Sequence, residues 1–141
     1  MSTLEQEIHT IGRRAREASR SLARLTADQK NAILEAMADE ILVRTPDILD
    51  ANALDTTAAE KAGLTSASID RLRLTEKRIA DMAAGIRQVA SLNDPVGEIL
   101  RCWTRPNGIE ISKIRTPIGV IGIIYESRPN VTADAAAISG H

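Results

Sequence analysis

Apolar residues recur at spacings of three and four along residues 4–42, the pattern of amphipathic helices. Two helix starts carry a capping box, in which a Ser or Thr precedes a Glu or Gln by three residues. These pairs are Ser2 with Glu5 and Thr26 with Gln29. The predicted apolar stripes are Leu4, Ile8, Ile11, Ala15, Ala18 and Leu22 in the first helix, and Ile33, Leu34, Met37, Ile41 and Leu42 in the second.

Three further helices are predicted before residue 95. Thr45 as an N-cap before Pro46 starts one, and Gly63 ends it. A short helix follows over 66–73, and another begins near Thr75. That helix ends at Asn93-Asp94-Pro95, because the residue before a proline is disfavoured in the helical region. Its apolar face is formed by Ile79, Met82, Ile86 and Val89.

The period then changes from helical to extended. Segments 98–105 and 109–115 flank Pro106-Asn107-Gly108, and Asn-Gly favours the positive φ angles of a tight hairpin turn. Basic side chains lie along both segments, so we expect a ribbon that pairs or packs on another surface rather than a core strand pair. These residues are Arg101, Arg105, Lys113 and Arg115.

Residues 118–125 form an apolar run without alternation, which is typical of a strand covered on both faces in a parallel sheet. A polar turn and the start of a helix over 131–138 follow it. A parallel strand needs a crossover and a parallel neighbour, and the sequence shows no second strand of this kind. We therefore predict an α/β fold, with this chain as its incomplete opening part.

Composition excludes several classes of protein. Hydrophobic residues make up 43% and charged residues 26%, which is typical of a soluble globular domain. The net charge is −1, and one Trp, one Tyr and no Phe leave little for stacking on bases, so nucleic-acid binding is disfavoured. The start of the chain lacks a signal-peptide pattern, and no apolar run has the length of a membrane span. We expect a cytoplasmic location.

The turn after segment 118–125 is the candidate site, because ligands of open α/β sheets bind outside the carboxyl ends of strands. The candidate substrate-binding residues are Ser127, Arg128, Asn130 and Thr132. A guanidinium and free helix N–H groups suit a carboxylate or phosphate. The competing interpretation makes Asn130 a helix cap and Arg128 a solvated charge.

Other residues of the chain give weaker evidence of a functional site than this turn does. Gly119 and Gly122 lie within the predicted strand rather than after it, so they do not form a nucleotide-binding loop. Cys102 is the single thiol, and we expect a buried or half-buried structural residue on the hairpin. His9 and His141, with one cysteine, make no metal-ligand cluster. We assign no catalytic or metal-binding residue to this chain and no cofactor-binding residue.

The run Tyr125-Glu126-Ser127-Arg128-Pro129-Asn130-Val131-Thr132 resembles the gamma-glutamyl phosphate reductase family of the aldehyde dehydrogenase superfamily. Pro117-x-Gly119-Val120-x-Gly122 is shared more loosely across that superfamily. The resemblance extends back through Arg105-Pro-Asn-Gly108 and Asp50-Ala-Asn-Ala-Leu-Asp55, and so covers the whole chain as the N-terminal portion of a longer one.

The resemblance implies NADPH-dependent reduction of L-glutamyl 5-phosphate to L-glutamate 5-semialdehyde and phosphate, in proline biosynthesis. It implies a nucleophilic cysteine beyond His141, which Cys102 does not match, so we expect this chain alone to be inactive. It also implies a homo-oligomer when full length, with glutamate 5-kinase as a candidate partner. In aldehyde dehydrogenases an asparagine in this turn helps to bind the oxyanion. Ungapped alignment places Arg128 there, and a two-residue shift places Asn130.

By resemblance, residues 1–95 form the helical part of a cofactor-binding domain and 96–116 the hairpin of an oligomerisation element. Residues 117–141 then form the first strand, turn and helix of a Rossmann-like parallel sheet of the aldehyde dehydrogenase type, truncated. The alternative function is a noncatalytic helical module that binds a partner through its β-hairpin.

Overall fold

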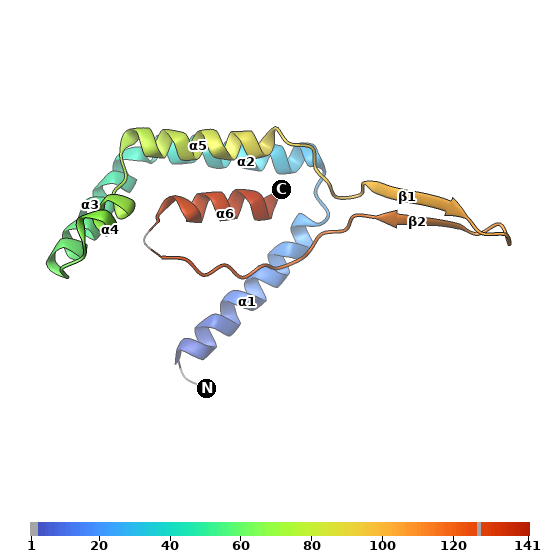
Figure 1. Cartoon of the computed structure of the whole chain (residues 1–141), viewed down its shortest axis with the longest axis horizontal. Helices are drawn as coiled ribbons and strands as arrows, with labels where there is room; N and C mark the ends of the chain where they lie inside the picture. The colour runs from blue at the N-terminus through green and yellow to red at the C-terminus, as the bar shows by residue number, and fades with distance from the viewer. Residues whose placement is uncertain (1–2, 127) are drawn as a thin grey trace. The chain divides into compact units, whose positions relative to one another are not determined.

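The computed structural model describes residues 3–126 and 128–141. Chain contacts divide it into two units. Unit 1 contains α1, β1 and β2, and unit 2 contains residues 26–92 and 122–141 with the remaining helices. The order along the chain is α1 (Thr3–Leu22), α2 (Ala27–Val43), α3 (Thr45–Lys61), α4 (Ser66–Leu72), α5 (Glu76–Ala90), β1 (Ile99–Thr104), β2 (Glu110–Ile114) and α6 (Asn130–Gly140) (Figure 1).

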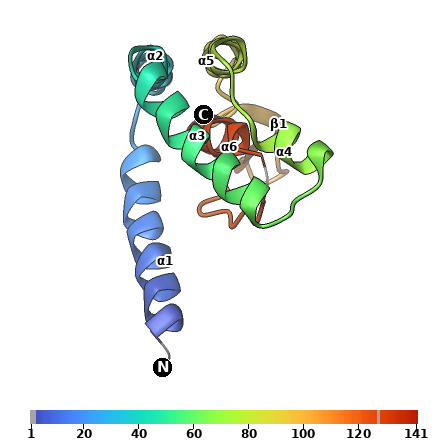
Figure 2. The same cartoon turned by 90° about the vertical axis from the view of Figure 1, so that its left-hand side faces the viewer.

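The core of unit 2 lies between α2, α5 and α6. Figure 2 shows α2 and α5 side by side, viewed end-on. Many of the buried positions are alanines, whose small side chains let helix backbones approach closely. The predicted apolar face of α5 is confirmed, since Ile79 and Ile86 are buried and Met82 and Val89 pack against the core. The core cluster is Leu34 and Ala38 of α2, Ala83, Ile86 and Ala90 of α5, and Ala133 and Ala137 of α6.

Local capping sets most helix boundaries in unit 2. The capping box of α2 is confirmed, because Gln29 N donates to Thr26 Oγ1 (3.2 Å) and Thr26 N donates to Gln29 Oε1 (3.0 Å). Thr75 caps α5 through its side chain alone, accepting from the backbone N–H of Arg78 (3.1 Å). Each cap satisfies helix-end N–H groups that have no partner within the helix.

The boundaries of α3 differ in one detail from the sequence prediction. Arg44, not Thr45, occupies the N-cap position, and the Thr45 hydroxyl donates back to the Ile41 carbonyl (3.3 Å) in the preceding helix. Thr45 is therefore engaged with α2 and does not cap α3. The predicted C-terminal end is confirmed, because Gly63 has φ +75° and the N–H of Leu64 reaches the carbonyl of Ala59 (3.1 Å), the pattern of a Schellman motif.

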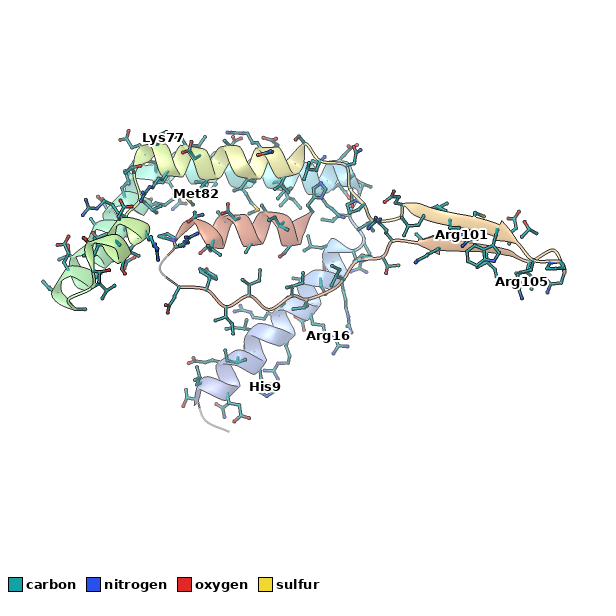
Figure 3. All side chains as sticks on the ribbon, in the orientation of Figure 1. His9, Arg16, Lys77, Met82, Arg101 and Arg105 are labelled. Carbon is teal, nitrogen blue, oxygen red and sulfur yellow. The ribbon has the colours of Figure 1, made fainter. Side chains whose placement is uncertain are left out.

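The predicted β-hairpin is confirmed in unit 1. β1 and β2 pair antiparallel, with Cys102 opposite Ser112. Gly108 of the turn has a positive φ, +83°, and its N–H donates to the Arg105 carbonyl (2.9 Å). Arg101 lies over the Trp103 ring at 5.3 Å (Figure 3 shows Arg101 on the hairpin). The hairpin is thus stabilised by the hydrogen bonds between its strands, by its turn and by side-chain contacts within the hairpin.

Two sequence expectations in this region are wrong. Cys102 is exposed, because both faces of β1 are open to solvent. Segment 118–125 forms no strand: a strand requires a hydrogen-bonded neighbour, and the described residues supply no such partner for it. The side chains of this segment are consequently exposed to solvent, and Ile118 is 87% exposed. The helix predicted after it is present as α6.

None of the helices in the described ranges combines the length and the apolar character that a membrane span requires.

Candidate functional site

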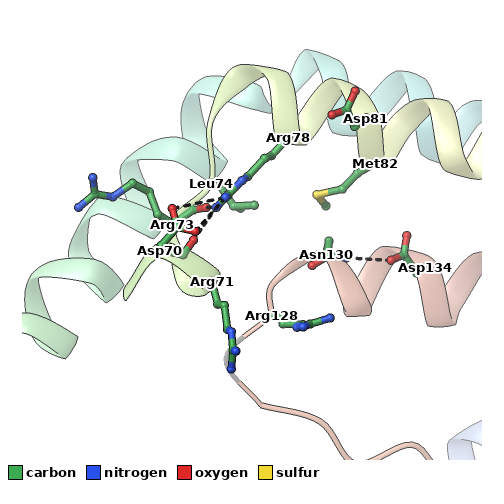
Figure 4. A pocket seen from close by; sticks show the side chains of 10 residues that line it. All are labelled: Asp70, Arg71, Arg73, Leu74, Arg78, Asp81, Met82, Arg128, Asn130 and Asp134. Carbon is green, nitrogen blue, oxygen red and sulfur yellow. Dashed lines mark hydrogen bonds and ion pairs between the residues drawn. The ribbon is translucent and has the colours of Figure 1, made fainter. Parts of the chain in front are cut away.

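An open pocket of about 390 Å³ lies in unit 2, where α4, the α4–α5 turn, α5 and the start of α6 meet (Figure 4). Its volume is in the range of small-molecule sites. Two of the predicted site residues, Arg128 and Asn130, line it. Its lining residues are Asp70, Arg71, Arg73, Leu74, Arg78, Asp81, Met82, Arg128, Asn130 and Asp134.

Thr132 is not among the residues that line this pocket. It lies in the first turn of α6, and its hydroxyl is 2.6 Å from the Tyr125 hydroxyl. That contact ties α6 to the end of the preceding segment. Ser127 lies outside the described residues.

A buried asparagine holds the turn that forms one wall of the pocket. Asn52 of α3 is 6% exposed, and its side-chain amide donates to the carbonyl of Leu72 (2.9 Å). Its carbonyl oxygen accepts from the backbone N–H of Leu74 (2.7 Å). The same side chain therefore satisfies a donor and an acceptor on either side of Arg73, which fixes the backbone between α4 and α5.

Arg78 fastens the same turn from α5. Its guanidinium donates to the backbone carbonyls of Asp70 and Arg73 and forms an ion pair with the Asp70 carboxylate (3.3 Å). These bonds span the end of α4 and the residue after it. Together, Asn52 and Arg78 give Arg71, on the last turn of α4, a defined backbone position at the rim of the pocket.

Most charged groups of the pocket already have partners. Asp81 pairs with Lys77 (2.7 Å) and Arg73 with Glu60 (3.7 Å), in addition to the pair of Asp70 with Arg78. Asn130 donates its side-chain amide to Asp134 Oδ2 (3.0 Å).

Two guanidinium groups remain. Within residues 3–126 and 128–141, the side chains of Arg71 and Arg128 make no hydrogen bond or ion pair, and Figure 4 draws both without partners. Arg71 comes from α4 and Arg128 from the chain just before α6. A guanidinium presents a planar fork of donors that matches a carboxylate or phosphate. The pocket can therefore accept an anionic group.

The competing interpretation of Asn130 as a helix cap is wrong. Pro129 occupies the N-cap position of α6, and no side chain among the described residues caps this end. Asn130 is the first residue of the helix, and its amide is turned toward Asp134, one turn further on. Its side chain thus lines the pocket instead of satisfying the helix end.

Sequence reasoning missed the wall of the pocket that includes Arg71 and Arg78, and it missed Asn52, which holds the turn of that wall. A signal was present, because three arginines surround the short segment between two predicted helices, at positions 71, 73 and 78. The sequence pattern did not indicate that this segment lies beside residues about fifty positions later in the chain. Met82, which Figure 4 shows pointing from α5 toward α6, was predicted as core and also lines the pocket.

Comparison with known proteins gives one consistent result, although no family model matches the chain. It is 59% identical over 128 residues to a gamma-glutamyl phosphate reductase of Mesorhizobium japonicum, covering 91% of this chain and 30% of that protein. It is 56% identical over 132 residues to one from Moorella thermoacetica, covering 94% of this chain and 32% of that protein.

Solved structures agree. The gamma-glutamyl phosphate reductase of Thermotoga maritima matches with a TM-score of 0.88 and 40% identity, over 91% of this chain and 32% of that one. The Saccharomyces cerevisiae enzyme matches with a TM-score of 0.87 and 31% identity, over 99% and 35%. The resemblance found in the residues is confirmed, and these neighbours are consistent with the predicted α/β class. The chain spans about a third of the length of these relatives.

Proposed function

We propose that this chain supplies the N-terminal part of a gamma-glutamyl phosphate reductase, an NADPH-dependent enzyme of proline biosynthesis. The observation that supports this best is sequence identity above one half across more than nine-tenths of the chain. The reaction converts L-glutamyl 5-phosphate, NADPH and a proton into L-glutamate 5-semialdehyde, phosphate and NADP⁺.

The chemistry proceeds by covalent catalysis. A cysteine thiolate attacks the acyl carbon, a C–S bond forms, the C–O bond to phosphate breaks, and phosphate leaves. Reduction of the thioester then releases the aldehyde and restores the thiolate. NADPH, when bound, would supply the hydride for that reduction. The thiolate belongs to the part of the relatives that this chain does not span, and Cys102, exposed on the hairpin, does not take this role.

The residues of this chain bind and orient the substrate. Arg128 and Asn130 line the pocket and offer a guanidinium and an amide to an anionic group. Thr132, bonded to Tyr125, fixes the first turn of α6 beside them. Ser127 stays a prediction from the sequence. None of these groups exchanges a proton or forms a covalent bond in this scheme.

The residues of this chain do not fit a dinucleotide-binding loop. The sequence contains no G-x-G-x-x-G, and Gly119 and Gly122 precede the turn instead of following it. We therefore assign no residue of this chain to NADPH. Cytoplasmic location and glutamate 5-kinase as a partner follow from the resemblance alone.

The hairpin is proposed to act as part of an oligomerisation element when the protein has full length. Every strand residue is exposed except Ile111, which is half-buried, and the ribbon has unpaired edges. Such edges accept another strand. The competing function, a noncatalytic module that binds a partner through this hairpin, uses the same exposed surface.

A chimaera tests the enzymatic proposal. This chain replaces the matched N-terminal part of the Mesorhizobium japonicum relative, and NADPH oxidation is followed with glutamyl phosphate generated in place. We expect an active chimaera and an inactive 141-residue chain, with the unmodified relative as the positive control. A folded but inactive chimaera would favour the noncatalytic module. NADPH turnover by the chain alone, lost in Cys102→Ala, would contradict the assignment of the nucleophile.

A further inference from the structure

The pocket carries charges of both signs, which limits what it can bind. Arg71 and Arg128 have no partner within the described residues, so two positive groups are available to a ligand. Asp134 lies on the same wall, and only its Oδ2 accepts a bond, from Asn130. A carboxylate accepts at both oxygens, so Asp134 retains capacity for a donor.

A phosphate alone suits this arrangement poorly. It carries between one and two negative charges near neutral pH and has no cationic group to pair with an acidic side chain. Asp81 and Asp134 line the pocket and would repel it, and Lys77 offsets only the first of them. An anion accompanied by a cationic donor, in contrast, finds a partner for each charge.

We propose that this pocket binds the α-amino acid end of the substrate. Arg71 and Arg128 bind the α-carboxylate, and Asp134 accepts from the α-ammonium group. The apolar side chains of Leu74 and Met82 lie beside the methylene groups of the substrate. This inference rests on the proposed reductase function, and it makes Arg71 a specificity-determining residue.

The position of Arg71 supports this role over a structural one. Arg78 and Asn52 already fix the turn through backbone groups, so the fold does not need the Arg71 side chain. Arg71 is exposed and makes no ion pair in the described part of the chain. An exposed arginine at the rim of a defined pocket can bind a carboxylate in a bidentate manner.

Kinetics of the chimaera in the reverse direction test the proposal. L-Glutamate 5-semialdehyde, phosphate and NADP⁺ are the substrates, so the KM of each is measured separately. Two analogues isolate the charges: 4-aminobutanal lacks the α-carboxylate and 5-oxopentanoate lacks the α-ammonium. Arg71→Ala should raise the KM for L-glutamate 5-semialdehyde about tenfold or more. It should leave unchanged the KM for 4-aminobutanal and that for phosphate.

Three variants sharpen the test. Arg71→Lys keeps the charge but loses the bidentate fork, so it should recover part of the affinity. Asp134→Asn should raise the KM for L-glutamate 5-semialdehyde but not that for 5-oxopentanoate. Arg16→Ala, on α1 and outside the pocket, is the matched control and should change none of these constants. Melting curves of all variants check that folding is intact.

The outcomes separate this proposal from the proposed function. An unchanged KM for L-glutamate 5-semialdehyde in an active Arg71→Ala chimaera overturns the inference and leaves the reductase function standing. A raised KM for phosphate instead would mean that the pocket holds phosphate, which also overturns the inference.

If the unmodified chimaera is inactive, the proposed reductase function is contradicted. Titration of the 141-residue chain with L-glutamate and with inorganic phosphate, followed by NMR of the Asn130 amide, then decides the inference. Shifts with L-glutamate alone support it, and any other result contradicts it.

Discussion

The two units of this chain use the same sequence device with different results. Every buried side chain among the described residues lies in unit 2, where the apolar stripes of α2, α5 and α6 meet one another. In unit 1 the stripe of α1 is as regular, yet Leu4, Ile8 and Ile11 are exposed. Periodicity therefore predicts that a helix forms, whereas burial depends on whether a partner for the stripe lies within the same chain.

The difference has a consequence for energetics. Most helical stability in proteins comes from packing of the apolar face rather than from intrinsic propensity. Unit 2 should carry nearly all of the stability of this chain. Unit 1 should depend on local terms, the helix hydrogen bonds of α1 and the ladder of the hairpin.

The largest expected effect breaks the core of unit 2. Ile86→Ala removes a side chain that is 1% exposed and leaves a cavity between α2, α5 and α6, so we expect a loss of about 2–5 kcal/mol in the free energy of unfolding. Ile8→Ala makes the same change on α1, at a position that is 60% exposed. It should alter the free energy by no more than about 0.5 kcal/mol.

Urea unfolding of both variants, followed by far-UV circular dichroism, measures this contrast. Equal losses for Ile86→Ala and Ile8→Ala would contradict the division into a unit with a core and a unit without one.

A smaller effect concerns the turn between α4 and α5. Asn52→Ala leaves the Leu72 carbonyl and the Leu74 N–H without their partner, so we expect about 1–3 kcal/mol of destabilisation. Asn52→Asp keeps the acceptor but loses the donor, and it should also destabilise. Asn31→Ala, on α2, is the control, because its side chain makes no hydrogen bond in the described ranges. Melting temperatures of the three variants test this, and an Asn52→Ala melt like that of Asn31→Ala would show the turn to be held by other contacts.

The third prediction asks whether the turn before α6 serves binding or folding. In the active chimaera, Arg128→Ala and Asn130→Ala should each lower kcat/KM about tenfold or more, since a charge-assisted hydrogen bond is worth roughly 1.5–3 kcal/mol. The melting temperature should change little, because neither side chain caps α6 or enters the core. Loss of stability with normal kcat/KM in the folded fraction would make this turn structural.

The same pair of variants distinguishes the two alignments with aldehyde dehydrogenases. An effect of Arg128→Ala alone favours the ungapped alignment only if it persists with 4-aminobutanal, which lacks the α-carboxylate, and an effect of Asn130→Ala alone favours the shifted one.

Much of the local structure was predictable because local chemistry determines it. The capping box at Thr26, the end of α3 at Gly63 and the hairpin turn at Gly108 each depend on residues within a few positions. Asn130 was predicted as a site residue, but the sequence left a helix cap open as the alternative, because capping residues and pocket residues are the same types. Segment 118–125 was predicted as a strand from composition, but a strand exists only with its neighbour. The pocket was predicted only in part: Arg128 and Asn130 were expected, but Arg71 of α4 was not, because only the folded chain brings α4, α5 and the start of α6 to one pocket.

The smallest expected effect lies in unit 1. Cys102 is exposed on β1, where its sulfur is 3.5 Å from the Ser112 hydroxyl, a contact too weak to contribute to stability. Cys102→Ala should therefore change the free energy of unfolding of the chain by no more than about 0.5 kcal/mol. It should leave the activity of the chimaera unchanged. Gly108→Ala, six residues further on in the same hairpin, is the contrasting change, because φ is +83° there and a side chain strains the turn. Backbone amide shifts of the hairpin should move in Gly108→Ala and stay in place in Cys102→Ala. A loss of reductase activity in a folded Cys102→Ala chimaera would instead give this exposed thiol a part in catalysis, and unit 1 would then hold a functional group despite lacking a core.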